Sequence, residues 1–230
     1  MHEESVPAGD PRPAAAVKAA LRVLALCALL FVPARGISWA AGWLYAALYA
    51  GWSAAVVSLL GSRSPDLLRL RELERPAPAH WWDRVFGFAV TSLTFVMLAV
   101  CGADSRSASG WGSAARVSAF LAVVLSYALA LWALLSNPSA IGASAVRPGQ
   151  STAEAGPYSA LRHPFYLATA AFFLATPPAL GSAAAAVPAL LLACAVVFRT
   201  AMEDRLLRRS LPGYEAYAAR VRYRLLPGIW

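Results

Sequence analysis

The chain has 230 residues and a formal net charge of +8, and 59% of its residues are hydrophobic against 14% charged. This composition excludes an ordinary soluble domain, in which about a quarter of the residues are charged. It predicts an integral membrane protein whose partners include membrane lipids. The excess of cations then reflects topology and attraction to anionic headgroups, so we expect no nucleic-acid partner.

The N-terminal two thirds of the chain contain a short polar tail and four long apolar runs. Residues 1–13 combine Pro, Gly and acidic residues without periodicity, which predicts a disordered tail. Residues 14–136 are expected to form four transmembrane helices, each able to cross a hydrocarbon core of about 30 Å. The four runs cover residues 17–33, 38–60, 85–101 and 113–135. Residues 61–83 alternate Leu and Arg, predicting a cytoplasmic amphipathic helix on the membrane surface, followed by Trp81-Trp82 as an interfacial anchor.

Two further apolar runs, residues 165–176 and 182–198, follow a polar loop. Only Pro177-Pro178 and Gly181 separate them, which predicts a tight turn between antiparallel helices. The first of the two runs is short enough to be re-entrant. The expected fold class is therefore an all-α integral membrane protein with about five to six transmembrane helices.

The cations are concentrated in alternate connections of this topology. They lie in the N-terminal tail, in residues 63–84, just before Phe165 and from Arg199 onwards. Because Lys and Arg are retained on the cytoplasmic side during insertion, both termini are expected in the cytoplasm. The Ala-rich composition with a single Lys is typical of high-GC bacteria. We therefore expect the bacterial cytoplasmic membrane.

The three cysteines, Cys27, Cys101 and Cys194, stand singly within or at the ends of apolar runs. No CxxC spacing and no neighbouring His accompanies them. Such cysteines are typical packing residues. We therefore expect neither a disulfide nor a metal site.

The most informative feature is a pair of polar clusters at the ends of the last two apolar runs. The first contains Gly156-Pro157-Tyr158 and Arg162-His163-Pro164-Phe165-Tyr166, and the second contains Arg199 and Glu203-Asp204. Taken singly, these residues could be snorkelling cations and a helical ion pair worth about 0.3–0.5 kcal/mol. A helical hairpin, however, returns both clusters to the same membrane surface. Together they predict a polar pocket there, facing the cytoplasm.

The order of these motifs resembles a known family. GPY, RHPFY, a hairpin, RxxxED, PGYEAY and RLLPG, spread over residues 156–230, resemble the C-terminal region of the isoprenylcysteine carboxyl methyltransferase family. Members of that family, which is related to the phospholipid methyltransferases, are integral membrane enzymes that use S-adenosylmethionine. The resemblance implies that residues 137–230 form a methyltransferase catalytic region. It also implies that a C-terminal cytoplasmic helical segment completes the cofactor pocket.

The resemblance assigns roles to individual residues. Arg199 and Glu203 are implied to be catalytic: Arg199 would bind the carboxylate of the methyl acceptor, and Glu203 would contact the cationic cofactor. Gln150 stands at the approximate position of a cofactor-binding His in many members. The remaining implied cofactor-binding residues are Tyr158, His163, Pro164, Phe165 and Tyr166. A bidentate Arg grip suits a planar carboxylate, and a carboxylate needs no general base to accept a methyl group.

The expected function is transfer of a methyl group from S-adenosylmethionine to a lipophilic acceptor, most simply O-methylation of a carboxylate. Three alternatives remain open. First, the acceptor could be a lipid amine. Second, the protein could be an NADPH-dependent reductase resembling the sterol reductases, which share an Arg-His-Pro-x-Tyr element. Third, it could be a non-catalytic membrane scaffold, which the departure from the family pattern at residues 148–155 favours. The identity of the acceptor and the oligomeric state stay open.

Overall fold

The computed structural model describes residues 9–74, 80–107, 111–139 and 149–230, and the only regular secondary structure in these ranges is helical. Five of its helices are long and apolar enough to cross a membrane, since 23–25 residues at about 1.5 Å each span roughly 35 Å. They are α1 (Arg12–Ala34), α2 (Ala40–Arg63), α4 (Trp81–Asp104), α5 (Ser113–Leu135) and α7 (Ala186–Ser210). The predicted all-α membrane fold is confirmed.

Four shorter elements complete the described chain. They are α3 (Pro65–Glu72), the 3₁₀ helix η1 (Gly156–Ser159), α6 (Pro164–Leu180) and α8 (Tyr214–Arg220). Helix α6 is apolar but has only 17 residues, equivalent to about 25 Å. It is therefore the shortest of the helices that could enter a hydrocarbon core.

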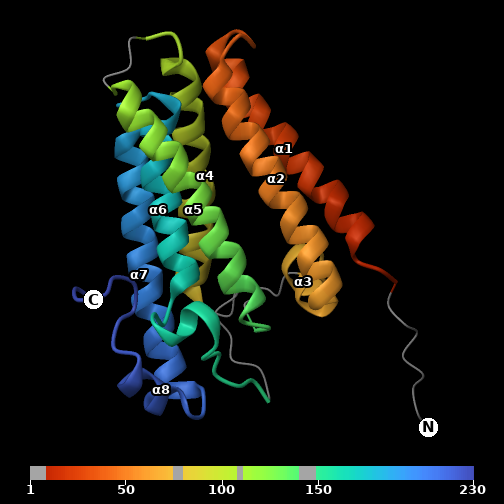
Figure 1. Ribbon diagram of the computed structural model, residues 1–230, viewed down its shortest axis with the longest axis vertical. Helices are drawn as coiled ribbons and strands as arrows, with labels where there is room; N and C mark the ends of the chain where they lie inside the picture. Colours follow the sequence, from red (N-terminus) through yellow and green to blue (C-terminus); the bar gives the residue numbers. More distant parts are fainter. Residues whose placement is uncertain (1–8, 75–79, 108–110, 140–148) are drawn as a thin grey trace.

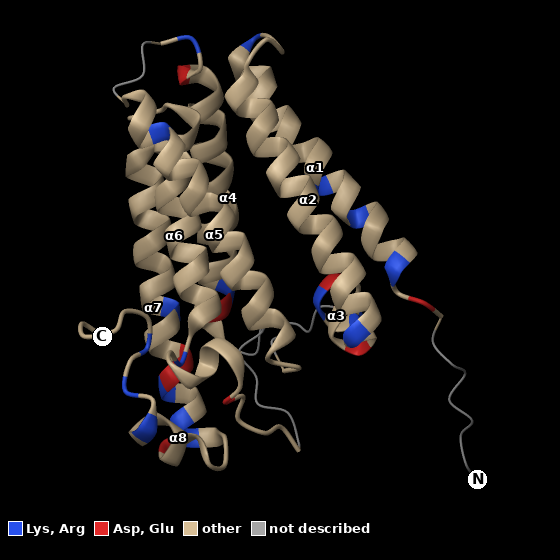
Figure 2. Cartoon of the chain, in the orientation of Figure 1, with Lys and Arg blue, Asp and Glu red and all other residues tan. Residues whose placement is uncertain are grey.

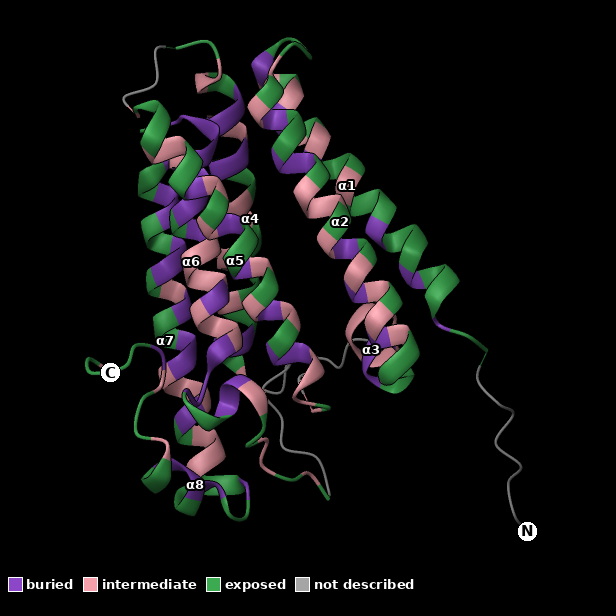
Figure 3. Ribbon diagram, viewed as in Figure 1, coloured by how far each residue is buried: buried purple, intermediate pink, exposed green. Residues whose placement is uncertain are grey.

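The helices form a bundle of α4, α5, α6 and α7, with the antiparallel pair α1 and α2 leaning against one end of it (Figure 1). Leu30, Tyr45, Met97, Val123 and Leu192 are buried in the common core. Large apolar side chains remain exposed along the outward faces of the long helices (Figure 3). Exposed apolar surface on this scale is suited to contact with lipid.

Close packing of α1 on α4 depends on Gly102. A Cβ atom at this position would overlap the backbone carbonyl of Leu30, whereas a Cβ on Gly87 of the same helix would meet nothing within 4 Å. We expect Gly102→Ala to lower the free energy of unfolding by about 1–3 kcal/mol. Gly87→Ala should be neutral or stabilising by up to about 1 kcal/mol. Thermal unfolding of both variants in detergent checks this, and equal midpoints would contradict it.

The turn between α6 and α7 lies later than predicted. Helix α6 continues through Pro177 and Pro178, and the chain reverses at Gly181, whose φ is 82°. The N–H groups of Gly181 and Ser182 donate to the carbonyls of Pro178 and Pro177, at 3.3 and 2.9 Å. Proline disfavours a helix because it removes a backbone hydrogen-bond donor. In a membrane protein, contacts with neighbouring helices can compensate for the lost hydrogen bond. Glycine accepts the left-handed conformation that ends the helix.

Three other local expectations need correction. Helix α1 already begins at Arg12, with Pro13 in its first turn, so residues 12–13 do not belong to a disordered tail; residues 1–8 lie outside the described ranges. Helix α3 is present, but its Leu67 and Leu68 are buried against α1, α2 and α5 instead of facing lipid. Of the two tryptophans predicted to anchor the chain at the interface, Trp82 is buried within the protein, whereas Trp81 is 63% exposed.

Candidate functional site

The α6–α7 hairpin brings the two polar clusters of the sequence together at one end of the bundle. Charged residues gather at this end, around the C-terminal part of α7 and α8, while the middle of the bundle carries few (Figure 2). Helix α6 begins at Pro164, directly after His163, and α7 leaves its apolar stretch after Phe198. Two networks of side chains lie here, one on each side of α7.

The first network, the Arg199 cluster, consists of Arg199, Tyr166, Glu203 and Asp83. Arg199 Nε donates to the Tyr166 hydroxyl at 2.7 Å, and that hydroxyl donates to Glu203 Oε2 at 2.6 Å. Arg199 Nη1 pairs with Asp83, and Nη2 lies 3.6 Å from Glu203. The cluster therefore joins α4, α6 and α7 through one guanidinium group.

Aromatic rings enclose this guanidinium. Arg199 is 3% exposed, and its Cζ lies 4.6 Å from the centroid of Phe86 and 5.7 Å from that of Trp82. Cation–π contacts of this kind gain strength when water is excluded. Trp82 and Asp83 come from the first turn of α4, far from Arg199 in the sequence. Asp83 was not among the residues predicted for the site, because nothing in its local sequence connects it with Arg199.

Asp83 should be a structural partner of Arg199. Replacing Asp83 by Asn keeps the shape but removes the charge, so we expect the free energy of unfolding to fall by about 1.5–3 kcal/mol. The exposed Asp66 in α3 provides the matched Asp→Asn control, with an expected loss of under about 1 kcal/mol. Thermal unfolding in detergent measures both. A loss no larger than that of the control would show that the buried pair contributes nothing.

The second network, the Asp204 cluster, centres on a carboxylate that is fully buried. Its members besides Asp204 are Arg162, His163, Arg208, Tyr214 and Arg224. Arg162 Nε donates to Oδ1 at 2.9 Å and Arg224 Nε donates to Oδ2 at 2.9 Å. The Tyr214 hydroxyl donates to Oδ1 at 3.0 Å, and His163 Nε2 lies 3.3 Å from the same oxygen. One carboxylate thus holds four segments of chain together.

Arg162 also fixes the chain that follows α8. Its Nη1 donates to the carbonyls of Val221 and Arg222 at 2.9 and 3.0 Å. Its backbone N–H donates to the carbonyl of Tyr223, and the N–H of His163 donates to that of Arg224, both at 3.0 Å. Residues 221–224 are therefore attached along the start of α6. This explains how a segment distant in sequence becomes part of the site.

Tyr158, in η1, contacts α8 and the segment that follows α5. The Tyr217 hydroxyl donates to its carbonyl at 2.8 Å, and Asn137 Nδ2 lies 3.4 Å from its hydroxyl. Burial raises the pKa of Tyr158 to about 12.

The predicted site residues divide between these environments. Arg199, Glu203 and Tyr166 contact one another directly, as described above. His163 instead belongs to the Asp204 cluster, although its ring centroid lies 5.8 Å from that of Tyr166. Pro164 is buried at the start of α6. The guanidinium carbon of Arg71 lies 5.2 Å from the centroid of the Phe165 ring. Gln150 is half-buried in the segment before η1.

Glu203 gives the Arg199 cluster a partly exposed carboxylate that a cationic group could contact. Among Arg199, Asp83 and Glu203, one guanidinium faces two carboxylates, so these three side chains carry a net negative charge. Glu203 is the accessible member, since 22% of its side chain is exposed against 4% for Asp83. A sulfonium or ammonium group would find both a carboxylate and aromatic faces here. Within the described ranges, no group of three or more His, Cys, Asp or Glu residues could hold a metal ion.

No model of a known protein family matches the chain, and a search of curated proteins finds no match to it. The motif resemblance to membrane methyltransferases therefore stands on the residues themselves. Its implications for activity are a proposal, which the chemistry of the Arg199 cluster has to support.

Proposed function

We propose that this protein transfers a methyl group from S-adenosylmethionine to a lipophilic acceptor at the membrane interface. The observation that carries the proposal is Glu203, a partly exposed carboxylate that accepts a hydrogen bond from Tyr166. It lies one turn beyond Arg199, just after the apolar stretch of α7 ends. At this position a water-soluble cationic cofactor and a lipid-embedded acceptor can meet.

The residues of the Arg199 cluster would act by binding and alignment. S-adenosylmethionine, when bound, supplies a methyl group already activated on a positively charged sulfur. Glu203 would hold the cationic part of that molecule, and the Tyr166 hydroxyl would keep the carboxylate in one orientation. Because an acceptor carboxylate is already ionised at neutral pH, the protein needs no general base for O-methylation. The rings of Trp82 and Phe86 would exclude water from the reacting atoms.

The acceptor is proposed to be a carboxylate, bound by Arg199. The pairing of Arg199 with Asp83 means that such an acceptor would have to take the place of the Asp83 carboxylate, an exchange of one anion for another. The same pairing favours a second candidate acceptor, a lipid amine. An amine would be attracted by the net negative charge of the cluster and would leave the Arg199–Asp83 pair intact.

Cofactor binding and methyl transfer are tested separately. Calorimetry of the purified protein in detergent should detect binding of S-adenosylmethionine, and absence of binding would refute the methyltransferase proposal. Binding of NADPH instead, seen as a thermal shift, would support a reductase.

In membranes supplied with S-adenosylmethionine labelled in the methyl group, label should enter the lipid extract. Base treatment releases label from a methyl ester but not from an N-methyl amine, so it distinguishes the two acceptors. Binding without any labelled product would support a non-catalytic scaffold.

A further inference from the structure

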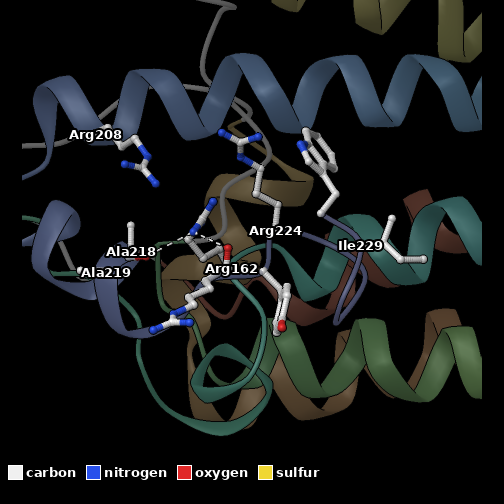
Figure 4. A pocket seen from close by; sticks show the side chains of 9 residues that line it. Arg162, Arg208, Ala218, Ala219, Arg224 and Ile229 are labelled. Atoms are coloured by element: carbon white, nitrogen blue, oxygen red, sulfur yellow. Dashed lines mark hydrogen bonds between the residues drawn. The ribbon is translucent and has the colours of Figure 1, made fainter.

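A basic hollow of about 500 Å³ is lined in part by three arginines of the Asp204 cluster, Arg162, Arg208 and Arg224 (Figure 4). We call it the arginine pocket. Its walls come from the start of α6, the end of α7, α8 and the C-terminal segment. The residues that matter here are Arg162, Arg208, Arg222, Arg224 and Trp230.

The arginine pocket has an excess of positive charge. Its four arginines have Asp204 and Glu215 as their carboxylate partners among the described residues, and Asp204 is shared by three of them. Four guanidinium groups against these two side-chain carboxylates leave an excess of positive charge. Arg162 uses its donors on Asp204 and on three backbone carbonyls, whereas the five N–H donors of each of Arg208, Arg222 and Arg224 are not all used within the described residues. The pocket therefore suits a compact anion with several acceptor oxygens.

The depth of the pocket relative to the apolar helices indicates where that anion comes from. Phe198 is the last large, exposed apolar residue of α7, and Asp204 lies six residues later, or about 9 Å along the helix axis. The headgroup layer on each side of a bilayer is about 5–8 Å thick. Asp204 therefore lies just beyond this layer, and the long side chains of the arginines around it can extend back to the lipid phosphates.

The rim of the pocket is suited to the same layer. Ile229 is 79% exposed and Leu226 is 45% exposed, although both are strongly apolar. The Arg224 guanidinium lies 4.9 Å from the centroid of the Trp230 ring. Exposed apolar side chains beside Arg and Trp are typical of segments that enter the membrane interface. A free anion in water would not require this rim.

We propose that the arginine pocket binds the phosphate of an anionic phospholipid, with the rim of residues 223–230 inserted among the headgroups. Arg222, Arg224 and Arg208 would hold the phosphate oxygens, since Arg geometry matches phosphate bidentately. The site is separate from the Arg199 cluster, so this proposal stands whether or not the protein transfers methyl groups. It predicts selectivity for phosphatidylglycerol over phosphatidylcholine, whose phosphate is masked by a cationic amine.

Native mass spectrometry of the purified protein in detergent, titrated with each lipid, tests the proposal. The wild type should retain phosphatidylglycerol in preference to phosphatidylcholine. Arg222→Gln should weaken this retention about fivefold, because one cation near an anionic lipid contributes about that factor. Arg222 is exposed and has no ion-pair partner among the described residues, so its loss should not disturb folding. Arg209→Gln, which removes an exposed charge outside the pocket, should leave retention within about twofold.

Three results would overturn the proposal. Equal retention of the two lipids by the wild type would show no recognition of an anionic headgroup. Equal losses in Arg222→Gln and Arg209→Gln would show that only overall surface charge matters. Inorganic phosphate that binds the lipid-free protein as tightly as phosphatidylglycerol would make the pocket a site for free anions.

Discussion

Replacing Asp204 by Asn is expected to lower the free energy of unfolding by about 3–5 kcal/mol, since breaking a buried ion pair leaves uncompensated charge behind. Three arginines depend on this carboxylate, and Arg162 is itself only 5% exposed. Asparagine can replace a hydrogen-bond acceptor but not the negative charge. The remaining cations would then repel one another inside the protein.

Thermal unfolding in detergent measures this loss, and limited trypsin digestion locates it. Cleavage after Arg222 and Arg224 should become fast in Asp204→Asn, because these residues are held through Arg162 and Asp204. Glu215→Gln is the matched control. It removes the other carboxylate partner of Arg208 at an exposed position, where an ion pair contributes at most about 1 kcal/mol. An unchanged digestion pattern in Asp204→Asn would contradict the role assigned to the cluster.

Glu203→Gln is expected to weaken binding of S-adenosylmethionine roughly 30- to 150-fold, equivalent to about 2–3 kcal/mol, while the protein stays folded. The substitution preserves the size of the side chain and an oxygen that can accept from Tyr166. It removes the charge that would stabilise the cationic cofactor. Because Glu203 is partly exposed, its neutral form leaves no fully buried charge unpaired.

Calorimetry on the purified variant gives the dissociation constant directly. Glu154→Gln serves as the control, since Glu154 is an exposed carboxylate paired with Arg220 outside both clusters. It should bind S-adenosylmethionine with unchanged affinity. If Glu203→Gln also bound with unchanged affinity, Glu203 would not be the cofactor carboxylate, even if the wild type proved to be a methyltransferase.

The membrane fold could be predicted because it depends on local properties of the chain. Hydrophobic run length sets whether a helix can cross a bilayer, and all five long helices lie where such runs were found. The α6–α7 hairpin likewise followed from two apolar runs separated by turn residues. The turn lies later than the prolines predict, because α6 continues through Pro177 and Pro178 to Leu180.

Only some residues of the candidate site could be predicted from the sequence. Arg199, Tyr166 and Glu203 share one hairpin, so their meeting could be expected from the sequence. Asp83 could not be placed beside them, because it lies 116 residues from Arg199 and only the packing of α4 on α7 joins the two. Asp204 was assigned no role of its own by the motif resemblance. One position along a helix turns a side chain by about 100°, and this rotation directs Asp204 towards α8 and the C-terminal segment instead of the Arg199 cluster.

The sequence by itself determined that this protein is a helical membrane protein with polar chemistry at one end of its last hairpin, because hydropathy and motif spacing are properties of neighbouring residues. Only the tertiary structure decided which charges pair. It gave Arg199 a partner in α4 and made Asp204 the centre of an arginine network, and it formed the arginine pocket from four separate segments. Ion pairs in a low-dielectric interior depend on distances of a few ångströms between remote residues, and only the folded chain sets those distances.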